Sequence, residues 1–113
     1  MNIVSSTQDS ISIAALVGRM DAVTTTEFDR YLADQRGRGV TQLVLDLQEL
    51  EYISSAGLRS ILQAAKQLKA QNGALLLCRL GGTVAEVFKM SGFLTIIPSF
   101  ADTEEACASL RQP

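Results

Sequence analysis

Histidine and tryptophan are absent from this chain of 113 residues, and cysteine occurs only twice. Without an imidazole, the chain cannot supply the base of a Ser-His-Asp or Cys-His catalytic site. It also has no histidine ligand for zinc or iron, and Cys78 and Cys107 alone cannot form a four-thiolate metal site. We therefore expect no catalytic residue, no metal centre and no cofactor, although an Mg²⁺ site made only of Asp and Glu stays open.

Long apolar runs and strong charge are lacking as well. Ten Lys and Arg against twelve Asp and Glu give a net charge of −2. The charges are interspersed, which argues against direct binding of nucleic acid. No run approaches the roughly 20 apolar residues of a membrane span, and the first residues do not resemble a signal peptide. We expect one domain, residues 1–113, in the cytoplasm, with both cysteines as reduced core thiols.

The first third of the chain predicts a β-hairpin followed by a helix. Residues 3–4 and 11–17 are apolar or alternating and flank a polar segment, and Gly18 is expected to end the second strand. A helix is predicted to begin near residue 24, because Thr24 and Glu27 have capping-box spacing and Val23 and Phe28 have the spacing of a hydrophobic staple. Glycines 37 and 39 should end this helix.

The remainder alternates between strands and helices. Strands are predicted at 43–47, 74–80 and 95–97, and the segment 48–54 is predicted to be a loop. Helices are predicted from 55 to 71, from a cap at Thr83 and Glu86, and from a cap at Asp102 and Glu105. The order ββαβαβαβα predicts an α/β fold with a mixed, mostly parallel sheet, and the opening hairpin supplies the antiparallel strand.

Two segments follow predicted parallel strands, where ligands collect in such folds. In the segment 46–58, Ser54 and Ser55 stand at the start of a helix, and the commonest role of a serine there is that of an N-cap. Ala56 and Gly57 occupy the first turn, and glycine is costly there, so we expect small residues to keep the hydroxyls accessible to another molecule. The segment 81–83 is either a turn with a threonine cap or the rim of the same docking surface.

The segment Tyr52-Ile53-Ser54-Ser55-Ala56-Gly57-Leu58 resembles the signature of STAS domains, the anti-sigma factor antagonists. The segments 18–23, 43–47 and 104–106 also resemble that family, in the right order, so that the resemblance covers essentially the whole chain. It implies a binding protein that is itself the substrate of a kinase. In the family, the unphosphorylated form binds an anti-sigma factor and thereby releases a sigma factor, and phosphorylation of a serine at this helix start abolishes the binding.

The resemblance implies that Ser55 is the phosphorylated residue. Many members carry an aspartate just before that residue, whereas this chain has Ser54 there, so Ser54 is the alternative acceptor. The implied partners are an anti-sigma factor that is an ATP-binding serine kinase, and a serine phosphatase. Asp21 would add negative charge beside the site, or it would act only as a turn residue. The predicted partner-binding residues are Asp21, Ser54, Ser55, Ala56, Gly57, Leu58, Arg59, Gly81 and Gly82.

Two other classes of protein need residues that this sequence lacks, and a third alternative stays open. A response-regulator receiver needs an acidic pair after its first strand and a lysine after its last, and neither is present. A serine hydrolase needs a GxSxG turn and a base. A STAS module that binds a nucleotide or another small molecule without phosphorylation, or that controls another output by protein interaction, stays open. Phe88, Met90 and Phe93 are predicted to lie mainly in the core, with one of them exposed.

Overall fold

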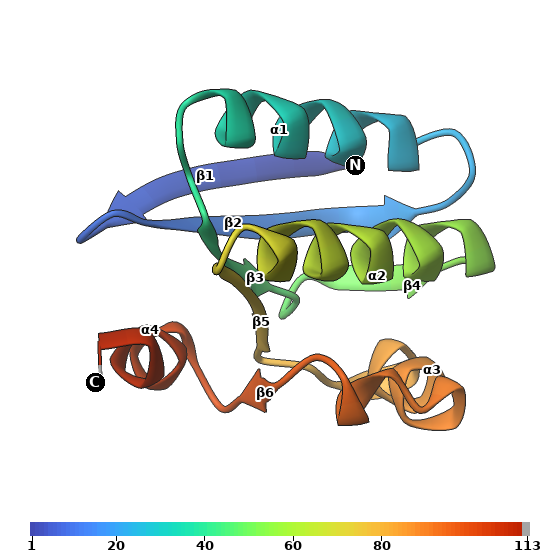
Figure 1. Cartoon of the computed structure of the whole chain (residues 1–113). Coiled ribbons are helices and arrows are strands. Elements are labelled where there is room, and N and C mark those ends of the chain that lie inside the picture. The colour runs from blue at the N-terminus through green and yellow to red at the C-terminus, as the bar shows by residue number, and fades with distance from the viewer. Residues whose placement is uncertain (112–113) are drawn as a thin grey trace.

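A mixed sheet, covered by helices on both faces, forms the centre of the structure, which describes residues 1–111 (Figure 1). In this computed structural model the sheet order is β1-β2-β3-β5-β6, and β4 pairs with β2. Only β1 and β2 pair antiparallel, so the predicted α/β class with an opening hairpin is confirmed. The elements are β1 (Asn2–Gln8), β2 (Ile11–Met20), α1 (Thr25–Gly37), β3 (Gln42–Asp46), β4 (Leu50–Ile53), α2 (Ser55–Ala70), β5 (Ala74–Cys78), α3 (Gly82–Ser91), a 3-10 turn (Phe93–Thr95), β6 (Ser99–Phe100) and α4 (Thr103–Arg111).

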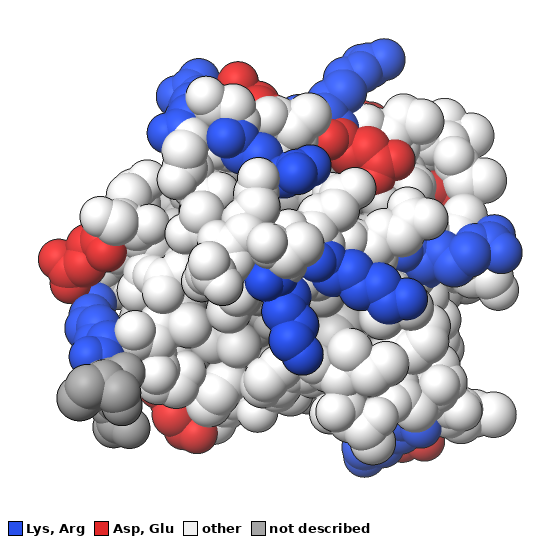
Figure 2. Space-filling view, in the orientation of Figure 1, with Lys and Arg blue, Asp and Glu red and all other residues white. Residues whose placement is uncertain are grey.

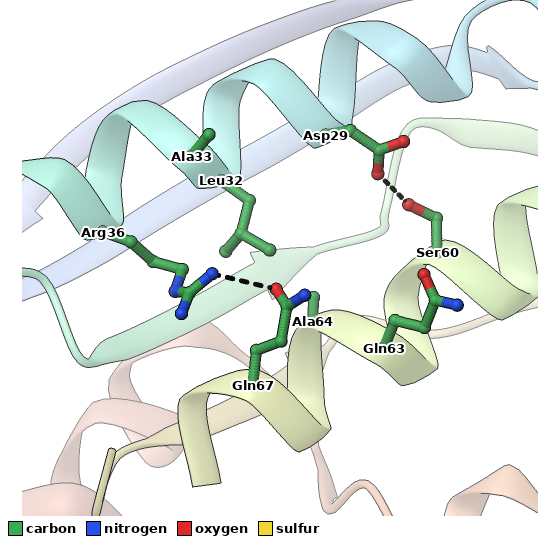
Figure 3. A pocket seen from close by; sticks show the side chains of 8 residues that line it. All are labelled: Asp29, Leu32, Ala33, Arg36, Ser60, Gln63, Ala64 and Gln67. Atoms are coloured by element: carbon green, nitrogen blue, oxygen red, sulfur yellow. Dashed lines mark hydrogen bonds between the residues drawn. The ribbon is translucent and has the colours of Figure 1, made fainter. Parts of the chain in front are cut away.

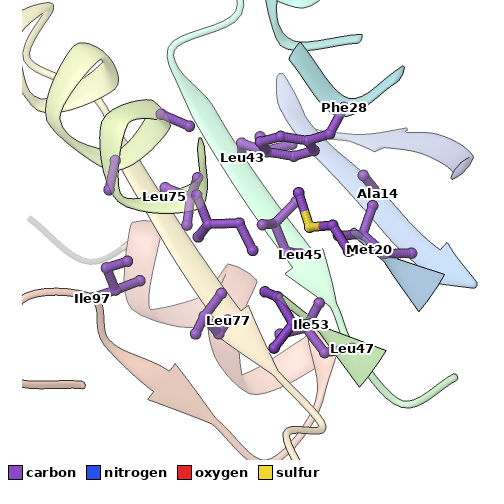
Figure 4. Packing of buried hydrophobic residues seen from close by; sticks show 14 of the residues in the cluster. Ala14, Met20, Phe28, Leu43, Leu45, Leu47, Ile53, Leu75, Leu77 and Ile97 are labelled. Atoms are coloured by element: carbon purple, nitrogen blue, oxygen red, sulfur yellow. The ribbon is translucent and has the colours of Figure 1, made fainter. Parts of the chain in front are cut away.

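The apolar runs of β3 and β5 are buried on both faces of the sheet. Leu43 and Leu45 pack in a large cluster to which α1, α2 and α3 contribute (Figure 4). Val44 and Leu76 face the opposite way, into a smaller cluster with Ala106 of α4. This two-sided burial explains why both strands read as nearly continuous apolar runs in the sequence.

The strand β2 is longer than predicted, because Gly18 does not end it. Gly18 has a φ of +104°, a left-handed conformation that glycine adopts without strain, and the register shifts between Gly18 and Arg19. The strand then continues to Met20 and pairs with β4 rather than with β3. This extension carries β2 directly to the serine segment.

The segment 48–54 was predicted to be a loop, and this was wrong. Residues 50–53 form β4, parallel to the end of β2. Leu50 and Ile53 are buried while Glu51 and Tyr52 between them are exposed. This pattern lacks the period of two that marks a half-buried strand, so only the pairing partner reveals β4.

The prediction of a last strand at 95–97 was also wrong. Gly92 adopts a left-handed φ of +77°, and residues 93–95 form a 3-10 turn. Thr95 Oγ1 donates to the carbonyl oxygen of Gly92 at 2.7 Å, which tightens this turn. The strand β6 follows Pro98 and contains only two residues. The strand β5 ends earlier than predicted, at Cys78, before Arg79 with its φ of +54°.

Of the three predicted helix caps, one is confirmed in full, one has the right position without the predicted side-chain contacts, and one is wrong. Thr24 is the N-cap residue of α1. The hydroxyl of Thr24 makes no capping bond to α1, and Val23 is 79% exposed, so it forms no staple with the buried Phe28. Thr83 lies inside α3, which begins at Gly82. Asp102 does act as predicted, because its Oδ1 accepts from the backbone N–H of Glu105 at 2.8 Å.

Both cysteines are buried, as expected from their apolar surroundings. Burial, together with the nearby carboxylate of Asp46, raises the pKa of Cys78 to about 12. Burial also raises the pKa of Cys107. Protonated thiols are poor nucleophiles, so neither is suited to reactive chemistry in the folded protein.

Among the helices within residues 1–111, none has the length and apolar character to cross a membrane.

Candidate functional site

The turn between β4 and α2 is held by backbone and side-chain hydrogen bonds from Ser54. Its N–H donates to the carbonyl oxygen of Met20 at 2.8 Å, which ties the turn to the end of β2. Its Oγ accepts from the N–H of Gly57 at 3.2 Å, and its carbonyl accepts from the N–H of Leu58 at 2.9 Å. Ser54 is therefore the N-cap of α2, and its hydroxyl is already in use.

Ser55, the first residue of α2, is exposed. Within residues 1–111, no hydrogen bond engages its hydroxyl. A third serine of this helix, Ser60, is buried, and its hydroxyl contacts a carboxylate oxygen of Asp29. Of these three hydroxyls, only that of Ser55 is both accessible and unengaged.

Gly57 serves close packing rather than access to the serines. A Cβ at this position would lie 2.9 Å from Ile53 Cγ1 and 3.0 Å from Met20 Cγ. Gly57 is buried, and Leu58 belongs to the core cluster. The expectation that Gly57 keeps the hydroxyls uncovered is therefore corrected: it lets the first turn of α2 sit directly on β2 and β4. Ala56 is half-buried beside Ser55.

Asp21 lies next to Met20, and its carboxylate closes the turn before α1. Its Oδ1 accepts from the N–H of Val23 at 3.0 Å and from the N–H of Thr24 at 2.9 Å. The hydroxyl of Thr24 donates to the carbonyl oxygen of Arg19 and accepts from the N–H of Asp21. The bond from the Thr24 N–H is the main cause that lowers the pKa of Asp21, so this side chain is ionised at neutral pH. Asp21 thus has the turn role that the sequence left open.

Gly81 and Gly82 follow β5 and are exposed at the start of α3. Gly81 is the N-cap with extended dihedrals, and Gly82 has a φ of +59°. The helix α3 packs against β4.

The β2–α1 turn, the start of α2 and α3 lie at the same end of the molecule (Figure 1). The structure therefore brings the segments of all the predicted site residues to one end of the sheet.

Two residues beside the serine turn were not singled out from the sequence. Arg19 and Tyr52 are paired in register on β2 and β4, and the Arg19 guanidinium lies 4.3 Å from the centre of the Tyr52 ring. Both are exposed. No sequence pattern predicts this cation–π contact, because it depends on the pairing of β2 with β4, which was itself missed.

Basic side chains follow the exposed face of α2. The helix contains Arg59, Lys66 and Lys69 and no acidic residue. Figure 2 shows Lys and Arg side chains gathered over α2 and over part of α1 on this face of the molecule. Arg59 is exposed one helical turn after Ser55, at the i, i+4 spacing of side-chain neighbours on a helix.

A groove of about 210 Å³ lies between α1 and α2 (Figure 3). Asp29 and Ser60 meet at one end of it, and Arg36 donates to Gln67 Oε1 at 3.3 Å farther along. The serine turn is not part of its lining. In the part of the chain that the structure describes, no group of three His, Cys, Asp or Glu side chains is placed to hold a metal ion.

Comparison with known proteins adds a family to this geometry. The family model described as the STAS domain matches residues 2–106. The chain belongs to the STAS domain family. A protein of Bordetella bronchiseptica that is named as an anti-sigma factor antagonist, BtrV, is 44% identical over 103 residues, which span 91% of this chain and 89% of that protein.

Solved structures of proteins named as anti-sigma factor antagonists share the fold. The crystal structure of a Thermotoga maritima protein named as an anti-sigma factor antagonist has a TM-score of 0.92 at 19% identity, covering 97% of this chain and 95% of that one. SpoIIAA, a Bacillus cell fate determinant, has been solved in a phosphorylated form, which has a TM-score of 0.76 at 20% identity and covers 97% of this chain and 100% of that one. Its unphosphorylated form, at 19% identity over 99% of this chain and 100% of that one, has a TM-score of 0.78.

Proposed function

We propose that this STAS domain protein is an anti-sigma factor antagonist that is switched by phosphorylation of Ser55. The observation that carries the proposal is the contrast between two adjacent hydroxyls. Ser54 caps α2 through the N–H of Gly57, whereas Ser55 is exposed and unengaged. The name of the Bordetella relative supports the same role for this chain.

The start of α2 can accept a phosphate without unfolding. Phosphorylation adds about −1.5 to −2 charges and three acceptor oxygens. The unpaired N–H groups and the dipole at a helix N-terminus favour an anion, and Arg59 stands one turn farther along the same face. That SpoIIAA has the same fold in both of its forms supports this view. The phosphate would then act on the partner, by charge repulsion and by occupying the contact surface.

The partner-binding surface that we propose is centred on the serine turn. Its exposed and half-exposed members are Asp21, Ser54, Ser55, Ala56 and Arg59. Gly57 and Leu58 support the turn from within, and Gly81 and Gly82 extend the surface onto α3. Asp21, ionised within its own turn, keeps a negative charge near the phosphate and adds to the repulsion.

The partners that we propose are an anti-sigma factor with serine kinase activity and a serine phosphatase. In the kinase step, the Ser55 Oγ attacks the γ-phosphorus of ATP, ADP leaves, and the serine proton passes to a base on the kinase. The chain has no histidine to act as that base. It is thus a substrate and a binding protein in this scheme and not the catalyst.

The direct test is to mix the chain with candidate kinases and ATP and to locate the modified residue by mass spectrometry. We expect Ser55→Ala to bind the kinase but to take up no phosphate, and Ser54→Ala still to be phosphorylated. Ser55→Asp should weaken binding by about tenfold or more. The control Gln63→Glu adds the same charge on the exposed face of α2 away from the turn and should bind normally. Phosphate on Ser54, or equal binding by both Ser55 variants, would overturn the proposal.

A further inference from the structure

The two edges of the sheet are protected very differently. At one edge, β6 contains two residues, follows Pro98, and pairs only with the end of β5. The start of β5 pairs with β3 on one side and has no strand on the β6 side, where it lies in a hollow with Lys66 and Lys69 on its rim. A short strand, a proline and lysines are the devices by which proteins prevent unwanted pairing at a sheet edge.

The other edge, β1, has none of these devices. Its seven residues contain no charged side chain and no proline. All seven pair with β2 in an unbroken register, so no bulge turns the strand away. Every residue except Ile3 is exposed. A long, uncharged and regular strand such as this is a template for further strand pairing.

The two faces of β1 have different surroundings. Ile3 packs on the main core, and Ser5 bonds to the hydroxyl of Tyr31 on α1 at 2.9 Å. Val4 points to the opposite face and is 62% exposed. Its cross-strand partner Ala15 is only half-buried, because α4 packs on β3, β5 and β6 at the far side of that face. Val4 therefore adds to an apolar strip on this face, which consists of Ile13, Ala15 and Val17 along β2.

We propose that β1 pairs antiparallel with β1 of a second copy of this chain, so that two sheets become one across a two-fold axis. We take the pairing strand to be β1 of a second copy, because two β1 strands are compatible with each other. Neither strand brings a charge to the contact, so there is no like-charge repulsion between them. The two apolar strips to which Val4 adds would meet near the axis, as an isologous interface requires.

This pairing leaves the serine turn free. The strand β1 pairs with β2 only as far as Val17, and β4 pairs with β2 at residues 18–20. The proposed dimer would therefore present two separate copies of the Ser55 surface. The dimer proposal does not depend on phosphorylation or on the identity of any partner.

The test is sedimentation equilibrium of the full chain at concentrations between about 10 μM and about 1 mM. This range covers the dissociation constants expected for a dimer with a small interface. We expect a concentration-dependent rise from 12.2 kDa towards twice that mass. In the same range, hydrogen exchange of the β1 amides should slow with concentration. A chain that stays monomeric throughout, or one that dimerises without protecting β1, would overturn the proposal.

Two variants of Val4 test the contact itself. Val4→Lys should weaken dimerisation by about tenfold or more, because like charges would face each other across the axis. Val4→Thr keeps the β-branched shape and removes only apolar contact, so a smaller effect is expected. The control Ala108→Lys places the same charge on the exposed face of α4 and should dimerise like the original chain. Circular dichroism verifies that each variant is folded, and equal dimerisation by Val4→Lys would refute the interface.

Discussion

Replacing Gly57 with alanine should destabilise the protein, even though alanine is the better helix former. The new Cβ would lie 2.9 Å from Ile53 Cγ1, 3.0 Å from Met20 Cγ and 3.1 Å from the Met20 carbonyl oxygen. The side chains can shift, but the carbonyl oxygen is held by its bond from the Ser54 N–H at 2.8 Å. The first turn of α2 would therefore have to move away from β2.

The expected magnitude follows from two opposing contributions. Overfilling a well-packed site costs about 1–3 kcal/mol. Replacing glycine with alanine inside a helix gains about 1 kcal/mol. The net effect of Gly57→Ala is thus a loss of about 1 kcal/mol in the free energy of unfolding. Gly37 is the matched control, since it lies in α1 with no atom within 4 Å of an added Cβ. There only the gain applies, and because Gly37 is the last residue of α1 the gain is at most about 0.5–1 kcal/mol.

Urea denaturation followed by circular dichroism measures both free energies. We expect the two Gly→Ala changes to have opposite signs and to differ by about 2 kcal/mol. If both variants were stabilised to the same degree, close packing would not be the reason for glycine at position 57. The small residue would then be better explained by access to the serine turn.

Three further predictions concern capping and the buried thiols. Ser54→Ala should lower the free energy of unfolding by about 1 kcal/mol, since the N–H of Gly57 loses its acceptor, whereas Ser55→Ala should change it by less than about 0.5 kcal/mol. Equal losses in urea titrations would contradict the assignment of the cap. Cys78 has a pKa of about 12 in the fold and near 9.0 when unfolded, so its contribution is complete below pH 9.0 and declines as the pH rises towards 12. The slope of unfolding free energy against pH should reach about 1.4 kcal/mol per pH unit, and a Cys78→Ala variant that kept this slope would exclude the thiol as its source. A thiol reagent should label Cys78 and Cys107 only in denaturant, and rapid labelling of the native chain would disprove their inertness.

The sequence was sufficient where burial leaves a local pattern, either a continuous apolar run or a periodic stripe. The leucine runs of β3 and β5, the apolar stripe of α2 and the opening hairpin were all found from the sequence, although β2 extends farther and β5 ends earlier than predicted. Predictions failed where long-range pairing or backbone geometry decides. The strand β4 exists only because β2 continues past Gly18 to meet it. The apolar run 95–97 does not join the sheet, because Gly92 is left-handed and residues 93–95 form a 3-10 turn.

The candidate site shows the same division. The serine motif located the turn and its helix correctly, because capping and family resemblance are local signals. The sequence could not predict that Ser54 caps α2 while the hydroxyl of Ser55 stays exposed, because the two serines are adjacent and identical in type. Neither could the inward role of Gly57, which depends on Met20 and Ile53 from two different strands.

The bond from the Ser54 N–H to Met20 has a consequence for how Ser55 can be recognised. It fixes the backbone on one side of Ser55, and a helix of 16 residues fixes it on the other. The kinase that we propose for Ser55 would therefore meet a folded surface and not an extended substrate peptide. A synthetic peptide of residues 50–59 would carry the full motif and still be a poor substitute, because the shape of the whole domain presents the target.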